Sequence, residues 1–162
     1  NAQVVIPYAQ ESRGLGDVYK RQIVFRPNNL MFLYTFKIYY EDTDSGGVVY
    51  YANYLKFIER ARTEMINKLG FTLTTLLKEY DRLFLVKKIE CDYIESCKLE
   101  DTLNVQSKVL VLKNASFILE QNLLKQNKII FRSEIVMVCV NSQGAPSKIP
   151  SELLSLMKNK DG

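Results

Sequence analysis

The sequence predicts an α+β domain in which one long helix covers an antiparallel sheet. The first observation is a long amphipathic run between residues 53 and 69, and the second is a series of strand-like runs joined by short turn signals. Strands connected this tightly should form an antiparallel meander, and a single helix can cover one face of it. The chain of 162 residues is 47% hydrophobic and 25% charged, which suits a globular domain with a sizeable core.

The first strand and the long helix are predicted from their hydrophobic spacing. Residues 33–41 are rich in aromatic and β-branched side chains with partial alternation, which predicts a strand. From residue 53 onwards the apolar side chains recur at helical spacing, at Tyr54, Phe57, Ile58, Ala61, Met65 and Leu69. Gly70 follows directly and is a typical C-terminal stop.

The rest of the chain is predicted to be mainly strands. Strand-like runs occupy residues 83–94, 102–112, 116–124 and 128–140, with turn signals at 98–101, 113–114 and 126–127. A short helical or irregular piece is expected at residues 74–79, and residues 152–158 suit a short terminal helix. Such a sheet would have an open edge and an uncovered face, so pairing with a second copy would be favourable.

Residues 1–30 differ in character from the rest of the chain and show little periodicity. The run from Arg13 to Gln22 resembles read-through of a sequencing adapter, so we expect a non-native or disordered N-terminal extension here, with a sequencing artefact as one origin. An ordinary flexible extension is the alternative. Met31 is the expected true start, which gives a domain at residues 31–162, and neither version of the extension would carry the activity.

Charge and cysteine content narrow the class of protein. The net charge of +4 comes with scattered lysines, which falls short of a nucleic-acid interface but suits a phosphate-bearing ligand. The three cysteines have no paired spacing for a metal site and predict reduced thiols. No run has the length of a membrane span, and no secretory signal precedes the domain, so a cytoplasmic protein is expected.

Histidine is absent from the sequence, and this excludes several kinds of active site. Nucleophile pairs of serine or cysteine with histidine, and zinc sites that contain histidine, are ruled out. If the protein is an enzyme, carboxylate, backbone and hydroxyl groups must carry the reaction.

The segment from Tyr39 to Tyr54 is the most informative part of the chain. A strand-like run enters an acidic turn that contains Asp42 and Asp44, and two glycines then lead into the long helix. An acid at a helix N-terminus normally caps it, but the glycines also allow backbone N–H groups to approach a third party. This arrangement can act on a carbonyl group.

This segment and the helix after it resemble a known family. The matching residues are Tyr40, Asp42, Asp44, Gly46, Gly47, Asn53, Tyr54, Glu59, Arg60, Ala61 and Arg62. They resemble the signature of the hot-dog-fold acyl-CoA thioesterases of the 4-hydroxybenzoyl-CoA thioesterase and YbgC type, over about residues 33 to 149. The resemblance implies a hot-dog fold, in which the antiparallel sheet wraps around one long central helix. It also implies hydrolysis of acyl-CoA to free acid and CoA without cofactor or metal.

The resemblance also implies catalytic roles in the acidic turn. Asp44 matches the family's catalytic aspartate and would be the nucleophile or general base. The backbone amide of Tyr51 would donate to the oxyanion, while Gly47 and Val48 would line the approach. YbgC-type members usually carry histidine at the position of Tyr51, whereas 4-hydroxybenzoyl-CoA thioesterase-type sequences carry tyrosine. Asp42 is interpreted as a structural residue of the turn.

Further residues are candidates for substrate binding. Glu59 is a reserve candidate because another branch of hot-dog thioesterases has its catalytic carboxylate on the central helix. Its alternative role is an exposed ion pair with Arg62, beside one between Arg60 and Glu64. Related proteins commonly place groups near the nucleotide phosphates at positions that correspond to Lys87, Lys88, Lys113 and Ser116. Lys98 and Arg132 are other basic candidates.

Several alternatives stay open for the partners and the activity. The resemblance implies a homodimer or homotetramer with active sites at the subunit boundary. The thioester could belong to a fatty or aromatic acyl-CoA, or to an acyl carrier protein, which is acidic and would need a basic site mouth. A non-catalytic acyl-binding subunit is the remaining alternative. The YbgC-type resemblance also suggests a role in lipid metabolism.

Overall fold

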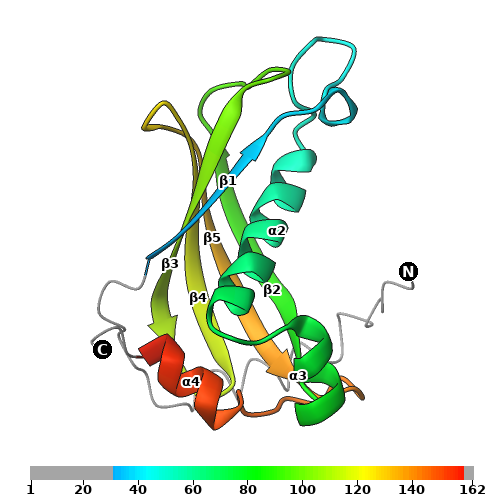
Figure 1. The fold of residues 1–162 in the computed structure, drawn as a ribbon, viewed down its shortest axis with the longest axis vertical. Coiled ribbons are helices and arrows are strands. Elements are labelled where there is room, and N and C mark those ends of the chain that lie inside the picture. Colours follow the sequence, from blue (N-terminus) through cyan, green and yellow to red (C-terminus); the bar gives the residue numbers. More distant parts are fainter. Residues whose placement is uncertain (1–30, 159–162) are drawn as a thin grey trace.

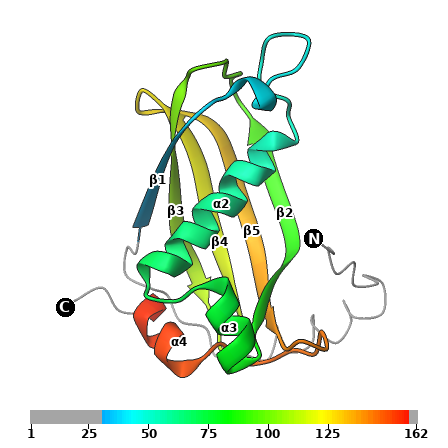
Figure 2. The same cartoon turned by 45° about the vertical axis from the view of Figure 1, so that its right-hand side comes forward.

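The computed structural model describes residues 31–158, which form a five-stranded antiparallel sheet and the helices that cover it. The elements are β1 (Met31–Lys37), a 3-10 turn (Tyr40–Asp42), α2 (Asn53–Lys68), α3 (Leu73–Tyr80), β2 (Leu83–Tyr93), β3 (Thr102–Leu112), β4 (Ser116–Lys125), β5 (Lys128–Val140) and α4 (Ser151–Lys158). Figures 1 and 2 show α2 lying across one face of the curved sheet, which confirms the predicted fold class. The expectations for residues 1–30 fall outside the described residues.

The long helix α2 starts and ends where the hydrophobic spacing predicts. Its last turn is followed by Gly70, whose φ of 89° lies in the left-handed region that favours glycine. The buried face of α2 contains Phe57, Ile58, Ala61 and Met65, which belong to the single large core cluster. This face packs on inward-facing side chains of the sheet, so burial of its apolar stripe stabilises the helix.

The first strand is shorter than predicted, because β1 ends at Lys37 and the chain then enters a 3-10 turn. The backbone N–H of Tyr39 donates to Oδ2 of Asp42 at 2.9 Å, which bends the chain out of the strand. The strand therefore ends at residue 37, four residues before the end of the predicted run at residue 41. Aromatic residues alone could not reveal this, because the bend depends on a carboxylate further along the chain.

The strand order is β1-β3-β4-β5-β2, and this corrects one prediction. The strands β3, β4 and β5 form the expected antiparallel meander, but β2 pairs with β5 at one edge of the sheet and is not next to β3. The place beside β3 belongs to β1, which pairs with it over all seven of its residues. The connection 94–101 is too long for a tight hairpin, so it carries the chain across the end of the sheet.

The acidic turn and the two shorter helices lie at opposite ends of the sheet. In both ribbon views the loop before α2 is at one end, while α3 and α4 lie together at the other (Figures 1 and 2). No helix within residues 31–158 is both long and apolar enough to cross a membrane.

Candidate active site

Asp42 anchors the acidic turn to the start of α2. Its side chain is buried, with 7% exposed, and its Oδ2 accepts the N–H of Tyr39. Its backbone carbonyl accepts the Nδ2 of Asn53 at 2.9 Å and the N–H of Tyr50 at 3.0 Å. These contacts support the interpretation that Asp42 is structural.

Asp44 is exposed and is oriented by the two glycines that follow it. Its Oδ1 accepts the N–H of Gly46 at 2.8 Å, and its backbone carbonyl accepts the N–H of Gly47 at 3.0 Å. The φ of Gly47 is 75°, a conformation that L side chains rarely adopt. Within residues 31–158, Oδ2 of Asp44 has no hydrogen-bond donor. The turn thus presents a carboxylate with one oxygen held and the other open to a ligand.

The start of α2 leaves a backbone donor beside this turn. Ala52 is the N-cap residue and makes no side-chain cap, so no hydroxyl or carboxylate occupies the helix end. The N–H of Tyr50 donates to Asp42 and the N–H of Asn53 donates to the Tyr50 carbonyl. The N–H of Tyr51 lies between them in sequence and has no acceptor among the described residues. A helix N-terminus favours negative charge, so this amide is suited to an oxyanion.

A neighbouring segment braces the turn at Val48. Val48 pairs with Lys98 in an isolated β-bridge, and the N–H of Val49 donates to the carbonyl of Cys97 at 2.9 Å. The bridge places Lys98, one of the basic candidates from the sequence, beside the loop that contains Asp44, and its side chain is exposed. The structure therefore brings together Asp44, Gly47, Val48 and Tyr51 within one short loop.

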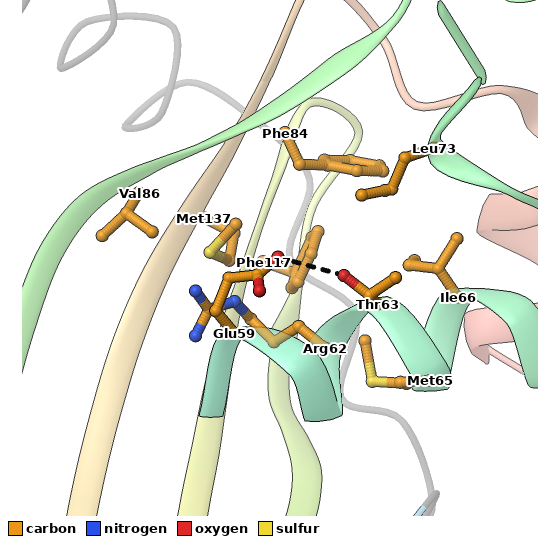
Figure 3. Close-up of a pocket in the computed structure, with 10 residues that line it drawn as sticks. All are labelled: Glu59, Arg62, Thr63, Met65, Ile66, Leu73, Phe84, Val86, Phe117 and Met137. Carbon is orange, nitrogen blue, oxygen red and sulfur yellow. Dashed lines mark hydrogen bonds between the residues drawn. The ribbon is translucent and has the colours of Figure 1, made fainter. Parts of the chain in front are cut away.

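Glu59 lies away from the turn and faces a separate pocket. It is eight residues beyond Tyr51, which corresponds to about 12 Å along a helix. The pocket has a volume of about 170 Å³ and is lined by Glu59, Arg62, Thr63, Met65, Ile66, Leu73, Phe84, Val86, Phe117 and Met137 (Figure 3). Its walls come from α2, the start of α3 and strands β2, β4 and β5.

The ion pairs expected on α2 do not form. Oε1 of Glu59 accepts the hydroxyl of Thr63 at 3.1 Å, and Arg62 instead donates from Nη1 to Oε1 of Gln121 at 2.9 Å. In the described part of the chain, Glu59 has no ion pair within 4.0 Å, nor does Glu64. Burial lowers the pKa of the Arg62 guanidinium, although the nearby Glu59 carboxylate acts in the opposite direction.

The lysines of β2 lie on the edge strand. Lys87 is at the bulge that separates Val86 and Lys88 in the pairing with β5, and Lys88 is exposed and forms an ion pair with Glu90. The hydrogen bond to Glu90 raises the pKa of Lys88. Both lysines lie near the middle of β2, whereas the Asp44 turn lies at one end of the sheet.

Lys113 and Ser116 lie in the β3–β4 hairpin, and both are buried, with 9% and 1% exposed. This hairpin is at the end of the sheet where α4 lies, opposite the Asp44 turn (Figure 1). The strand β3 separates the two ends, and a strand of this length spans about 35 Å. The structure does not bring these residues to the Asp44 turn of the same copy.

Tyr93 is a residue of this region that the sequence interpretation missed. Its hydroxyl donates to the backbone carbonyl of Tyr51 at 2.9 Å. The ring lies 5.1 Å from the ring of Tyr54 and 5.1 Å from that of Phe131, measured between centroids. Only its position at the end of a predicted strand could have marked Tyr93 as a candidate, because the contact with Tyr51 joins residues 42 positions apart.

The cysteines are all free, in agreement with the prediction of reduced thiols. Cys97 and Cys139 are buried, and burial raises the pKa of Cys139 to about 12. Burial also raises the pKa of Cys97, whose Sγ lies 3.2 Å from the hydroxyl of Tyr54. Within residues 31–158, no group of three Cys, Asp or Glu side chains is arranged to hold a metal ion.

Comparison with known proteins gives consistent matches. The family described as the thioesterase-like superfamily matches residues 39–156. The acyl-CoA thioesterase YbgC of Haemophilus influenzae is 41% identical over 123 residues, which cover 75% of this chain and 90% of that protein. A solved gentisyl-coenzyme A thioesterase is 28% identical with a TM-score of 0.72, covering 78% of this chain and 99% of the other. The 4-hydroxybenzoyl CoA thioesterase of Pseudomonas sp. strain CBS-3 shares the fold, with a TM-score of 0.73 at 15% identity, over 78% of this chain and 98% of the other.

Proposed function

The chain belongs to the thioesterase-like superfamily, and we propose that it is an acyl-CoA thioesterase that uses Asp44 as nucleophile or general base. The backbone N–H of Tyr51 donates to the oxyanion. The relative from Haemophilus influenzae, 41% identical over most of its length, is an acyl-CoA thioesterase by name and supports the substrate class. The observation that carries the catalytic assignment is the acidic turn, which presents the exposed Asp44 carboxylate in the loop that leads into a helix end without a side-chain cap.

Two routes are compatible with this geometry. As a nucleophile, Asp44 attacks the thioester carbonyl carbon, the C–S bond breaks, and CoA leaves as a thiolate that takes up a proton. Water then hydrolyses the acyl-aspartyl anhydride and regenerates the carboxylate. As a general base, Asp44 takes a proton from the water that attacks the same carbon; the C–S bond then breaks, and the proton passes to the departing CoA thiolate. In both routes the Tyr51 amide stabilises the charge on the carbonyl oxygen, and one such donor is worth about 3 kcal/mol.

The test is a thiol-release assay of the full chain with short-chain, long-chain and aromatic acyl-CoAs. We expect the parent to release CoA and both Asp44→Asn and Asp44→Ala to lose at least about 100-fold in kcat. Glu41→Gln is the matched control, because Glu41 is an exposed acid of the same loop with no hydrogen bond among residues 31–158. It should keep the parent's activity.

Two results would contradict the proposal. If the Asp44 variants keep the parent's kcat, Asp44 is not the catalytic group, and Glu59 becomes the next carboxylate to substitute. If the parent hydrolyses no acyl-CoA but releases acid from an acyl-carrier-protein thioester, the alternative substrate is correct.

The charge near the acidic turn does not favour this alternative. Lys125 at this end of the sheet is ion-paired with Asp101 at 2.8 Å, so it does not add free positive charge for an acidic carrier.

The other binding residues require a second copy of the chain. The hairpin with Lys113 and Ser116 is too far from Asp44 to serve the same site in one copy. The edge strand β2 pairs only with β5 among the described residues, and an open edge favours pairing with another copy. We therefore propose a homodimer or homotetramer, with Lys87 and Lys88 near the nucleotide phosphates. A role in lipid metabolism follows from the same proposal, and sedimentation would measure the assembly.

A further inference from the structure

We propose that Tyr93 is a positioning residue for the oxyanion donor: its hydroxyl holds the Tyr51 carbonyl and thereby fixes the direction of the Tyr51 N–H. This inference rests on the proposed function and adds to it a residue from the edge strand β2. Tyr93 touches neither substrate nor reacting atoms in this scheme. It acts through the backbone of Tyr51.

The Tyr51 carbonyl needs an external donor. In a regular helix the N–H of Leu55 would reach this carbonyl, but it donates to Ala52 at 3.2 Å instead. The hydroxyl of Tyr93 takes this place, at 2.9 Å from the Tyr51 oxygen. A side chain from β2 therefore satisfies a backbone carbonyl just before the start of α2.

The ring of Tyr93 packs against two buried aromatic side chains. The Tyr93 ring makes edge-to-face contacts with Tyr54 and Phe131, at interplanar angles of 80° and 69°. Tyr54 and Phe131 are almost completely buried, with 3% and 0% exposed. Tyr93 itself is 46% exposed, so the two buried rings hold it from one side; aromatic pairs of this kind favour one ring orientation and keep the hydroxyl near the Tyr51 carbonyl.

The two peptide groups on either side of the Tyr51 Cα atom are both fixed by hydrogen bonds. The carbonyl of Tyr50 accepts the N–H of Asn53 at 2.9 Å, and the carbonyl of Tyr51 accepts the hydroxyl of Tyr93. The Tyr51 N–H lies in the same planar peptide group as the Tyr50 carbonyl, so the Asn53 bond holds its plane, and the Tyr93 bond holds the adjoining plane and limits rotation about φ and ψ of Tyr51. The Tyr51 N–H then points in one direction before substrate binds, and a donor that needs no reorganisation stabilises the transition state best.

The experiment is Tyr93→Phe in the full chain, which keeps the ring contacts and removes the hydroxyl. We expect kcat to fall about fivefold to tenfold while KM changes less than about twofold, because a net hydrogen bond is lost where charge develops. Amide hydrogen exchange at residues 51–54 should become faster. The pH profile should keep its shape, because Asp44 is unchanged.

Tyr80→Phe is the matched control, since the Tyr80 hydroxyl donates to Oε2 of Glu152 at 2.7 Å, at the opposite end of the fold. It should lower Tm comparably to Tyr93→Phe but leave kcat unchanged. If Tyr93→Phe keeps the parent's kcat, or falls only as far as Tyr80→Phe, Tyr93 has no positioning role. Failure of the proposed function gives a different result from failure of the Tyr93 inference alone. In that case the parent would be inactive or Asp44→Asn would be active, and both proposals would be wrong.

Discussion

Gln121 is expected to be one of the most sensitive positions in the core. Its side chain is completely buried on the inner face of β4. Nε2 donates to the carbonyl of Ile58 at 3.0 Å and to Oγ of Ser107 at 2.8 Å, while Oε1 accepts Nη1 of Arg62. The amide thus joins helix α2 to two strands, and Gln121→Leu would remove all three contacts with little change in volume.

The loss of stability expected for Gln121→Leu follows from the groups that lose a hydrogen-bond partner. A hydrogen bond to a charged group contributes about 1.5 to 3 kcal/mol, and an unsatisfied buried hydroxyl costs about 1 kcal/mol or more. The Ile58 carbonyl keeps its helical bond, so its loss is small. The lost partners of Arg62 and Ser107 together lower the free energy of unfolding of Gln121→Leu by about 3 kcal/mol, which corresponds to a fall in Tm of about 10 °C for a domain of this size.

The assay is urea unfolding of the parent, Gln121→Leu, Arg62→Met and the double variant. If the unpaired guanidinium is the main cost, Arg62→Met should recover at least about 1 kcal/mol in the Gln121→Leu background. A loss below about 1 kcal/mol for Gln121→Leu, or strictly additive effects in the double variant, would refute this reasoning.

Two further predictions concern the acidic turn and the segment that braces it. A Cβ atom at Gly46 would lie 3.1 Å from Oδ1 of Asp44, so Gly46→Ala should displace the carboxylate and lower kcat about tenfold, with little effect on urea unfolding. Gly47→Ala should instead lower the free energy of unfolding by about 1 kcal/mol, because the φ of Gly47 is positive. Burial would raise the pKa of Asp101, but hydrogen bonds from Lys125 and the N–H of Lys98 outweigh it and lower that pKa. The stabilisation is therefore present at neutral pH and lost as pH falls through the lowered pKa, so Asp101→Asn should reduce Tm at about pH 7 and flatten its decline toward about pH 3.

The boundaries of most elements could be predicted because they depend on local signals. Hydrophobic spacing and Gly70 define α2, and the pair Gln126 and Asn127 defines the β4–β5 turn, where both residues have positive φ. The place of β2 at the far edge could not be predicted in this way. The position of β2 depends on which strand pairs with the free edge of β3. In the structure β1 takes this place, and its register with β3 is not visible in the sequence.

The acidic turn could be predicted as a segment, but the roles of the residues within it depend on burial. Asp42 and Asp44 are both acids of one turn, and nothing in their spacing separates them. Asp42 is buried and bonded to the backbone of Tyr39, whereas Asp44 is exposed with only Oδ1 held. The interpretation of Asp42 as a structural residue of the turn is supported by its burial and hydrogen bonds, whereas the catalytic role that the resemblance implies for Asp44 stays a prediction.

The unexpected course of the chain after β2 has a direct consequence for the site. Had β2 paired with β3, a short hairpin would have joined them and residues 94–101 would not have crossed the end of the sheet. The crossing instead brings Cys97 and Lys98 against Val48 and Val49, while the end of β2 brings Tyr93 to Tyr51. Part of the local ordering of the Asp44 turn therefore comes from distant residues, so substitutions at the exposed positions Tyr93 and Lys98 should alter catalysis more than the stability of the sheet, unlike those at the buried Cys97.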